Sequence, residues 1–114
     1  MLPLVTRILI VDDDSITSEL IEFMMKNSAT NCEIVSVLTP TEGLSLAAVQ
    51  HFDLNVLDYR LASMSGPEVC RALRQMSVEA PIMFFTGEAS HGERAEAMRA
   101  GADAIWLSRM TLGN

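Results

Sequence analysis

The chain has 114 residues, of which 49% are hydrophobic and 20% are charged. This size and composition are typical of one compact domain, so we expect residues 1–114 to form a single domain with its own core. The apolar residues come in short runs, well below the roughly 18 that a membrane-spanning helix needs, which excludes a transmembrane segment. A formal net charge of −7 excludes direct binding to nucleic acid or to an anionic membrane, because both would repel the chain.

The two cysteines predict a reducing environment. Cys32 and Cys70 lie far apart, and neither belongs to a Cys-x-x-Cys or mixed Cys/His pattern. This usage favours free buried thiols over a disulfide or a zinc site, and free thiols are typical of a reducing compartment. We therefore expect a cytoplasmic protein.

Short apolar runs alternate with amphipathic stretches along the whole chain. The run Ile8–Val11 is continuous and aliphatic, which predicts a strand buried on both faces. Helix starts carry capping signals, as at Thr39, which is followed by Pro40 and Glu42 at the positions of an N1 proline and a capping-box glutamate. In chain order, the predicted elements are a strand at 8–11, a helix at 15–28, a strand at 32–38, a helix at 39–50, a strand at 54–57, a helix at 65–77, a strand at 81–85, a helix at 90–100 and a strand at 104–107.

Five strands that alternate with four helices predict an α/β fold. Because the strands are apolar and the loops short, we expect a doubly wound parallel sheet with helices on both faces, in three layers. In such sheets, ligands bind beyond the carboxyl ends of the strands. Polar residues stand at or next to these predicted ends: Asp12, Asp13, Asp58, Thr86 and Ser108.

The aspartates at the strand ends predict a cation site. Two like charges about 4 Å apart repel by about 4 kcal/mol at an effective dielectric constant near 20, so ionised Asp12, Asp13 and Asp58 would need a cation between them. Oxygen ligands with open water positions suit Mg²⁺. A carboxylate beside such an ion can attack a phosphoryl group, which makes aspartyl phosphate formation the expected reaction class. Asp14, the third aspartate of the run, is better explained as a complement to the dipole of the following helix.

The ordered motifs resemble the receiver domain of two-component response regulators across essentially the whole chain. "ILIVDDDS" matches the first strand and acidic pair of that family, "LNVLDYRLASMSG" matches its phosphoacceptor strand and loop, "PIMFFTGEA" matches its fourth strand, and "GADAIWL" matches the approach to its fifth. These matches put the phosphoacceptor at Asp58, the loop glycine at Gly66 and the switch threonine at Thr86.

The resemblance implies a function and a ligand set. It implies a flavodoxin-like sheet with strand order 2-1-3-4-5, in which Asp58 accepts a phosphoryl group from a histidine kinase or phosphotransfer protein. By resemblance, Mg²⁺ is bound directly by Asp13 and Asp58 and by the backbone carbonyl of Arg60, and through water by Asp12. Such a domain is a signalling module, and we do not expect it to be an enzyme.

The sequence departs from the family near the fifth strand. The family places a phosphoryl-contacting lysine seven residues after the glycine of its Gly-Ala pair, and this position holds Ser108, followed by Arg109. The usual aromatic residue of the fifth strand is replaced by Ile105, and a loop proline by Ala62. We hypothesise that the domain binds Mg²⁺ and accepts a phosphoryl group but switches weakly, because the hydroxyl of Ser108 can donate a hydrogen bond without neutralising charge.

A shifted register is a second interpretation of the same segment. Trp106 and Arg109 have the three-residue separation of the family's aromatic residue and lysine, so a one-residue insertion would restore both features. Nearby, we expect Arg60 to pair with Glu88, because they stand two residues beyond Asp58 and two beyond Thr86.

Two other functions remain open. The chain could be a degenerate receiver that acts as a phosphorylation-independent interaction module. The pattern Asp12-x-Asp14 also resembles the D-x-D motif of haloacid dehalogenase phosphohydrolases, although that family also has a lysine and a late acidic pair, which are absent after Asp58. Turnover of phosphate monoesters would distinguish this last alternative.

The resemblance also predicts a fifth helix that the printed sequence does not reach. In the family, that helix covers the sheet face shared with the helix at 15–28. We therefore expect the fifth helix to be missing or truncated, with an output domain, a linker or a homodimer partner covering this face.

Overall fold

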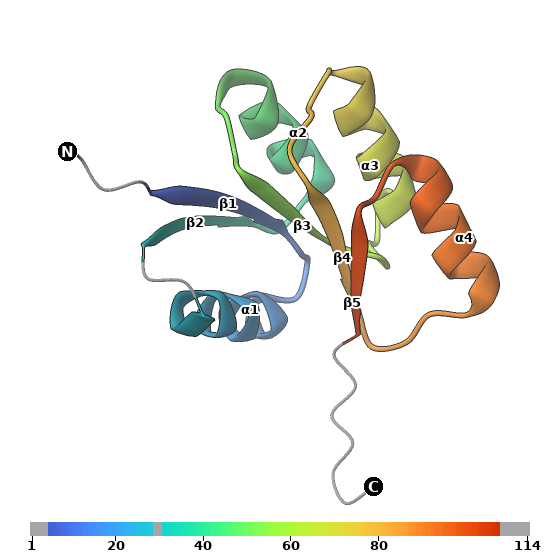
Figure 1. Ribbon diagram of the computed structural model, residues 1–114, viewed down its shortest axis with the longest axis horizontal. Helices are drawn as coiled ribbons and strands as arrows, with labels where there is room; N and C mark the ends of the chain where they lie inside the picture. Colours follow the sequence, from blue (N-terminus) through green and yellow to red (C-terminus); the bar gives the residue numbers. More distant parts are fainter. Residues whose placement is uncertain (1–4, 29–30, 108–114) are drawn as a thin grey trace, which may run out of the picture.

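The computed structural model describes residues 5–28 and 31–107. Strands and helices alternate along these residues (Figure 1). The strands are β1 (Thr6–Val11), β2 (Cys32–Val37), β3 (Leu54–Asp58), β4 (Ile82–Thr86) and β5 (Ala104–Leu107). The helices are α1 (Ser15–Ser28), α2 (Pro40–Val49), α3 (Gly66–Gln75) and α4 (His91–Ala100). Within the described part of the chain, no helix is long and apolar enough to cross a membrane.

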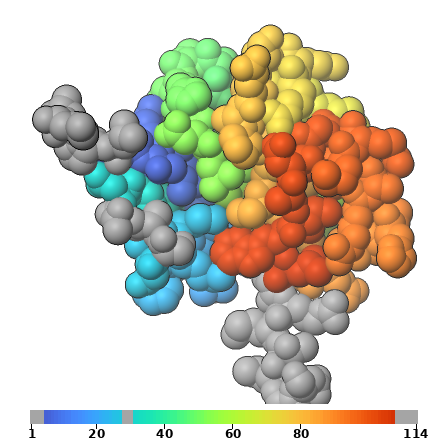
Figure 2. All heavy atoms as spheres, in the orientation of Figure 1, coloured from blue at the N-terminus to red at the C-terminus, as the bar shows by residue number. Residues whose placement is uncertain are grey.

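The strands form one parallel sheet in the order β2-β1-β3-β4-β5, which confirms the predicted doubly wound α/β fold. Helix α1 lies on one face of this sheet, and α2, α3 and α4 cover the other (Figure 1). In the space-filling view, α2, α3 and α4 run along the upper and right edges of the molecule, and α1 lies at the lower left (Figure 2). Four helices are therefore present in the described ranges, as expected.

Alternating side chains of the central strands build two cores. Leu9 and Val11 of β1 belong to the larger core under α2, α3 and α4, and Ile8 and Ile10 belong to the smaller core beside α1. All four side chains are at most 2% exposed. The continuous aliphatic run therefore forms a strand that is buried on both faces, as predicted.

The capping signals lie where the sequence predicts them. The hydroxyl of Thr39 accepts a hydrogen bond from the backbone N–H of Glu42 at 3.2 Å, and Ser65 accepts one from Glu68 at 3.2 Å. Ser90 and Glu93 form a full capping box at the start of α4. These bonds satisfy N–H groups that have no partner within the helix, and they fix where each helix begins.

Some element boundaries differ from the prediction at polar or exposed residues. Strand β1 begins at Thr6 rather than Ile8, because Thr6 and Arg7 pair with Cys32 and Glu33 at the edge of the sheet. Strand β2 ends at Val37, and Leu38 is 50% exposed beyond it. Hydrogen bonding between neighbouring strands sets where each strand begins and ends, and a pattern of hydrophobic residues does not reveal that pairing.

Gly66 allows α3 to begin directly against the end of β3. A Cβ atom at this position would lie 2.6 Å from the backbone oxygen of Asp58, 2.7 Å from a ring carbon of Phe84 and 2.8 Å from the Cα of Tyr59. Its backbone N–H donates to the oxygen of Tyr59 at 3.0 Å. The loop glycine is therefore required by close packing beside Asp58.

Replacing Gly66 with alanine is expected to lower the free energy of unfolding by about 2 kcal/mol or more, because backbone atoms must move to admit the methyl group. Urea denaturation would measure this loss. Gly92→Ala is the matched control, since its nearest new neighbour lies 3.9 Å away, and a gain of about 0.5 kcal/mol is expected there. Equal stabilities of the two variants would contradict the packing argument.

Candidate functional site

Three carboxylates gather at the carboxyl ends of β1 and β3. Asp12 and Asp13 follow β1 directly, and Asp58 is the last residue of β3. Val11 pairs with Leu57 in the parallel sheet, so the two strands end side by side. One carboxylate oxygen from each of the three aspartates lies within 4.8 Å of the other two. The residues predicted to bind a cation are therefore brought together.

Backbone N–H groups of the loops hold these carboxylates in place. Asp12 Oδ1 accepts a hydrogen bond from the N–H of Asp14 at 2.8 Å, and Asp13 Oδ2 accepts one from Ala62 at 3.2 Å. Asp58 Oδ1 accepts one from Arg60 at 3.1 Å. The bond from Ala62 joins the loop after β3 to the loop after β1, a link between distant segments that the sequence does not reveal.

Burial and the neighbouring carboxylates disfavour ionisation of Asp12 and Asp58. Asp12 is 2% exposed, and its burial raises its pKa from 3.8 to about 6, with a further contribution from the charges of Asp58, Asp13 and Asp14. Burial also raises the pKa of Asp58, and the charge of Asp13 adds to the effect, although hydrogen bonds to Arg60 and Asp12 oppose it. A cation among the three would relieve this repulsion.

The donor set fits a hard divalent cation. All three side chains offer oxygen, and the exposure of Asp13 leaves the cluster open to solvent on one side. Mg²⁺ prefers oxygen ligands, keeps several waters, and is usually held by one or two carboxylates. The arrangement is thus chemically suited to Mg²⁺.

Asp14 lies outside this cluster and caps α1. Its Oδ1 accepts a hydrogen bond from the N–H of Ile16 at 3.0 Å, and its Oδ2 accepts one from the hydroxyl of Thr17 at 3.0 Å. Both bonds lower the pKa of Asp14, and the bond from Thr17 has the larger effect. Asp14 therefore acts at the start of α1 through hydrogen bonds, and its favourable interaction with the dipole of that helix stays a prediction.

Thr86 is buried at the end of β4, which pairs with the end of β3. Its hydroxyl donates a hydrogen bond to the backbone oxygen of Glu88 at 3.1 Å. The sequence places Thr86 at this end of the sheet, and the structure agrees, with the hydroxyl directed toward the following loop.

Arg60 pairs with Glu93 at 2.7 Å, so the predicted pair with Glu88 is wrong. Glu93 is on the first turn of α4, and its Oε1 accepts the N–H of Ser90 while its Oε2 accepts the guanidinium of Arg60. The Ser90-x-x-Glu93 sequence predicts that Glu93 lies in the first turn of a helix. It does not predict that the second carboxylate oxygen of Glu93 can bond to Arg60 in the loop after β3.

Tyr59 adds a second connection between that loop and α4. Its hydroxyl donates to Glu96 Oε1 at 2.6 Å, and its ring packs edge-on against Phe84 with 5.3 Å between centroids. Burial raises the pKa of Tyr59 to about 12, and the bond to Glu96 contributes. The sequence analysis missed Tyr59 and Glu96, because no local pattern joins residues 37 positions apart.

A family model described as the response regulator receiver domain matches residues 8–107. The chain belongs to this receiver domain family. The cell cycle transcriptional regulator CtrA of Caulobacter vibrioides is 34% identical over 97 residues, which are 85% of this chain and 41% of the relative. The cell cycle response regulator CtrA of Brucella ovis is similar to the same extent. The receiver domain thus spans about two fifths of the length of these curated relatives.

Solved structures support the same assignment. The CheY-like receiver domain protein of Methanospirillum hungatei is 28% identical with a TM-score of 0.80, covering 94% of this chain and 84% of that one. The receiver domain of the sensor histidine kinase PA1611 from Pseudomonas aeruginosa has a TM-score of 0.81 at 23% identity, covering 94% and 88%, and this likeness shows the fold alone. In that structure a magnesium ion is coordinated in the active-site cleft. Receiver domains are regulatory rather than classical enzymes.

Strand β5 ends at Leu107, the last described residue of the chain. Ser108 and Arg109 lie outside the described residues. Strands β4 and β5 pair without interruption from Met83 with Ala104 to Thr86 with Leu107. Trp106 packs in the core beside α1, with its ring 5.0 Å from that of Phe85, and Ile105 packs in the core on the opposite face.

The pKa of Asp12 predicts how the stability of the metal-free receiver domain depends on pH. Folded Asp12 binds its proton more tightly than the unfolded chain does, so its stabilising effect is full below about pH 4 and is lost as the pH rises through about 6. Asp12→Asn should remove this pH dependence and raise the free energy of unfolding at pH 7.5 by about 1–3 kcal/mol in EDTA. Its affinity for Mg²⁺ should fall by about tenfold or more.

Glu19→Gln is the control for this experiment, because Glu19 is an exposed carboxylate on α1 that lies outside the cluster. Urea denaturation at several pH values and calorimetric titration with Mg²⁺ would provide both measurements. An Asp12→Asn variant as pH-dependent as the parent protein would contradict the assigned pKa.

Proposed function

We propose that Asp58 accepts a phosphoryl group from a histidine kinase or phosphotransfer protein in a Mg²⁺-dependent reaction. The observation that carries this proposal is the carboxylate cluster of Asp12, Asp13 and Asp58 at the carboxyl edge of the sheet. Asp58 is half-buried at the end of a rigid strand, so its carboxylate is held in place for attack on a donor. Receiver domain membership supports the same reaction.

Each residue of this site would have a separate role in the reaction. Asp13, Asp58 and the backbone carbonyl of Arg60 would hold Mg²⁺, and Asp12 would hold it through water. When bound, the ion neutralises negative charge on the carboxylates and on the phosphoryl oxygens. A carboxylate oxygen of Asp58 forms the new bond to phosphorus as the bond from phosphorus to the donor histidine nitrogen breaks, and its electron pair stays on that nitrogen. The hydroxyl of Thr86 would turn from the carbonyl of Glu88 to donate to a phosphoryl oxygen.

We infer that phosphorylation switches this domain weakly. The family's lysine position holds Ser108, and the only lysine of the chain, Lys26, is on α1. Without an ammonium group at that position, the phosphorylated and unphosphorylated states differ by one fewer strong contact, so phosphorylation shifts the equilibrium between conformations less. The same substitution favours the second candidate function, a degenerate receiver that binds partners without phosphorylation.

The curated relatives suggest how the domain is used. They are named as cell cycle regulators, and the region similar to this chain is 41% of their length. We propose that residues 1–114 form one receiver domain that works in the cytoplasm with an output domain or with a second copy of itself. Its net charge of −7 argues against direct nucleic-acid binding by this domain.

Phosphorylation of Asp58 is tested by incubating the protein with acetyl phosphate and Mg²⁺. Intact-mass spectrometry should detect one phosphoryl group on the parent protein and none on Asp58→Asn, because an amide is not a nucleophile for this transfer. The Asp14→Asn variant, altered outside the cluster, should be labelled as the parent is. An unlabelled parent protein would favour the degenerate receiver, and labelled Asp58→Asn would place the phosphoryl group elsewhere.

Ser108→Lys should strengthen the switch. Trp106 packs against Phe85, the neighbour of Thr86, so its fluorescence reports on this end of the sheet. With Mg²⁺ and beryllofluoride as a phosphoryl mimic, the parent and Ser108→Ala should give small changes of similar size, and Ser108→Lys a change at least about twofold larger. A parent protein that already matches the lysine variant would contradict the weak switch.

A further inference from the structure

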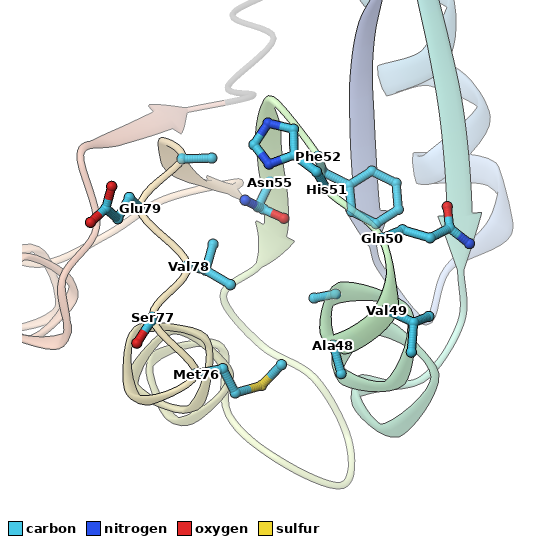
Figure 3. Close-up of a pocket in the computed structure, with 12 residues that line it drawn as sticks. Ala48, Val49, Gln50, His51, Phe52, Asn55, Met76, Ser77, Val78 and Glu79 are labelled. Atoms are coloured by element: carbon cyan, nitrogen blue, oxygen red, sulfur yellow. The ribbon is translucent and has the colours of Figure 1, made fainter.

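A hollow lies between the carboxyl ends of α2 and α3 (Figure 3). Its volume is about 370 Å³, which is in the range of small-molecule sites. Its wall is mixed: apolar side chains such as Val49, Met76 and Val78 alternate with polar ones such as Gln50 and Ser77. The hollow borders the amino end of β3, whereas Asp58 is at the carboxyl end of the same strand, so it is separate from the carboxylate cluster.

The floor of the hollow contains a polar group that lacks a partner. Asn55 is 1% exposed, and its Oδ1 atom is buried without a hydrogen bond. Its Nδ2 atom makes a long bond of 3.4 Å to the backbone oxygen of Pro81, which also accepts the backbone N–H of Asn55 at 2.9 Å. The amide oxygen is turned toward the space between α2 and α3 (Figure 3). Buried acceptors without partners are rare, and a donor from a ligand would satisfy this one.

The charged residues around the hollow indicate whether the ligand that carries this donor is itself charged. His51 and Glu79 are the titratable lining residues, both are exposed at the rim, and the ring of His51 already bonds to Asp53 at 3.2 Å. The deeper wall therefore carries no charge to pair with an ionic ligand. Val49 is 78% exposed and Met76 is 39% exposed, so apolar surface also continues out to the mouth.

We propose that this hollow binds a small, uncharged molecule that has an apolar body and one N–H or O–H donor, and that the donor bonds to Asn55 Oδ1. Because Oδ1 exposes less than 1 Å² to solvent, the ligand must press into the floor to reach it. Phe52 and Val78 flank Asn55 in this view (Figure 3), so their side chains would have to shift to let the donor reach Oδ1. The proposal is independent of phosphorylation at Asp58.

Indole and 1-methylindole form a matched pair of probes, because the two molecules have nearly the same apolar surface and the second lacks the N–H donor. Titration of the ¹⁵N-labelled protein should shift the amide resonances of Phe52, Asn55 and Val78, with indole binding about fivefold more tightly than 1-methylindole. No saturable shift at these residues, or equal affinity for the two probes, would overturn the proposal. This comparison uses the unmodified protein and needs no variant to fold.

Asn55→Leu tests the role assigned to the amide oxygen. The variant should melt a few degrees higher, because an unsatisfied buried amide is replaced by an apolar side chain. A structural role alone would also raise the melting temperature, so the deciding result is loss of the preference for indole. A retained preference would overturn the proposal. Asp58→Asn is the control that should bind indole as the parent does, and this result separates the hollow from the phosphoacceptor site.

Discussion

Electrostatic repulsion among Asp12, Asp13 and Asp58 is the constraint around which this end of the molecule is organised. Parallel pairing of β1 with β3 brings the three carboxylates together, and the aliphatic cores on both sides of the sheet keep these strands from moving apart. Stability gained in the core therefore holds an unfavourable cluster of charge in place. A cation bound among the three carboxylates would offset this repulsion, since all three groups would attract it at once.

The loops around the cluster reduce the repulsion without removing it. Backbone N–H groups from Asp14, Arg60 and Ala62 each bond to one carboxylate, which stabilises the ionised forms but leaves other oxygens facing the cluster. Gly66 supports the arrangement from behind, because only a residue without a side chain lets α3 begin this close to the backbone of Asp58. Gly66 and Asp58 thus determine both how closely α3 approaches β3 and where the carboxylate of Asp58 lies.

Much of the fold could be predicted, because its signals are local. Apolar runs and capping residues such as Thr39 and Ser65 mark the strands and helix starts within windows of a few residues, and strand ends locate the aspartates. The contacts that sequence reasoning missed join distant segments, as Arg60 joins Glu93. Asn55 was missed for another reason, because it lies within a strand whose sequence is mostly apolar. Only the folded structure shows that its amide oxygen lacks a hydrogen-bond partner.

The two oxygens of Glu93 connect the loop after β3 to the first turn of α4. One oxygen completes the cap of α4 and the other holds Arg60, two residues after Asp58. A loop that withdraws Arg60 leaves the first turn of α4 with a carboxylate that is less well anchored, and helix ends fray where their caps weaken. The length of α4, rather than its position alone, is therefore coupled to the loop. Amide hydrogen exchange in the turn after Ser90 would then vary with the state of a carboxylate on another strand.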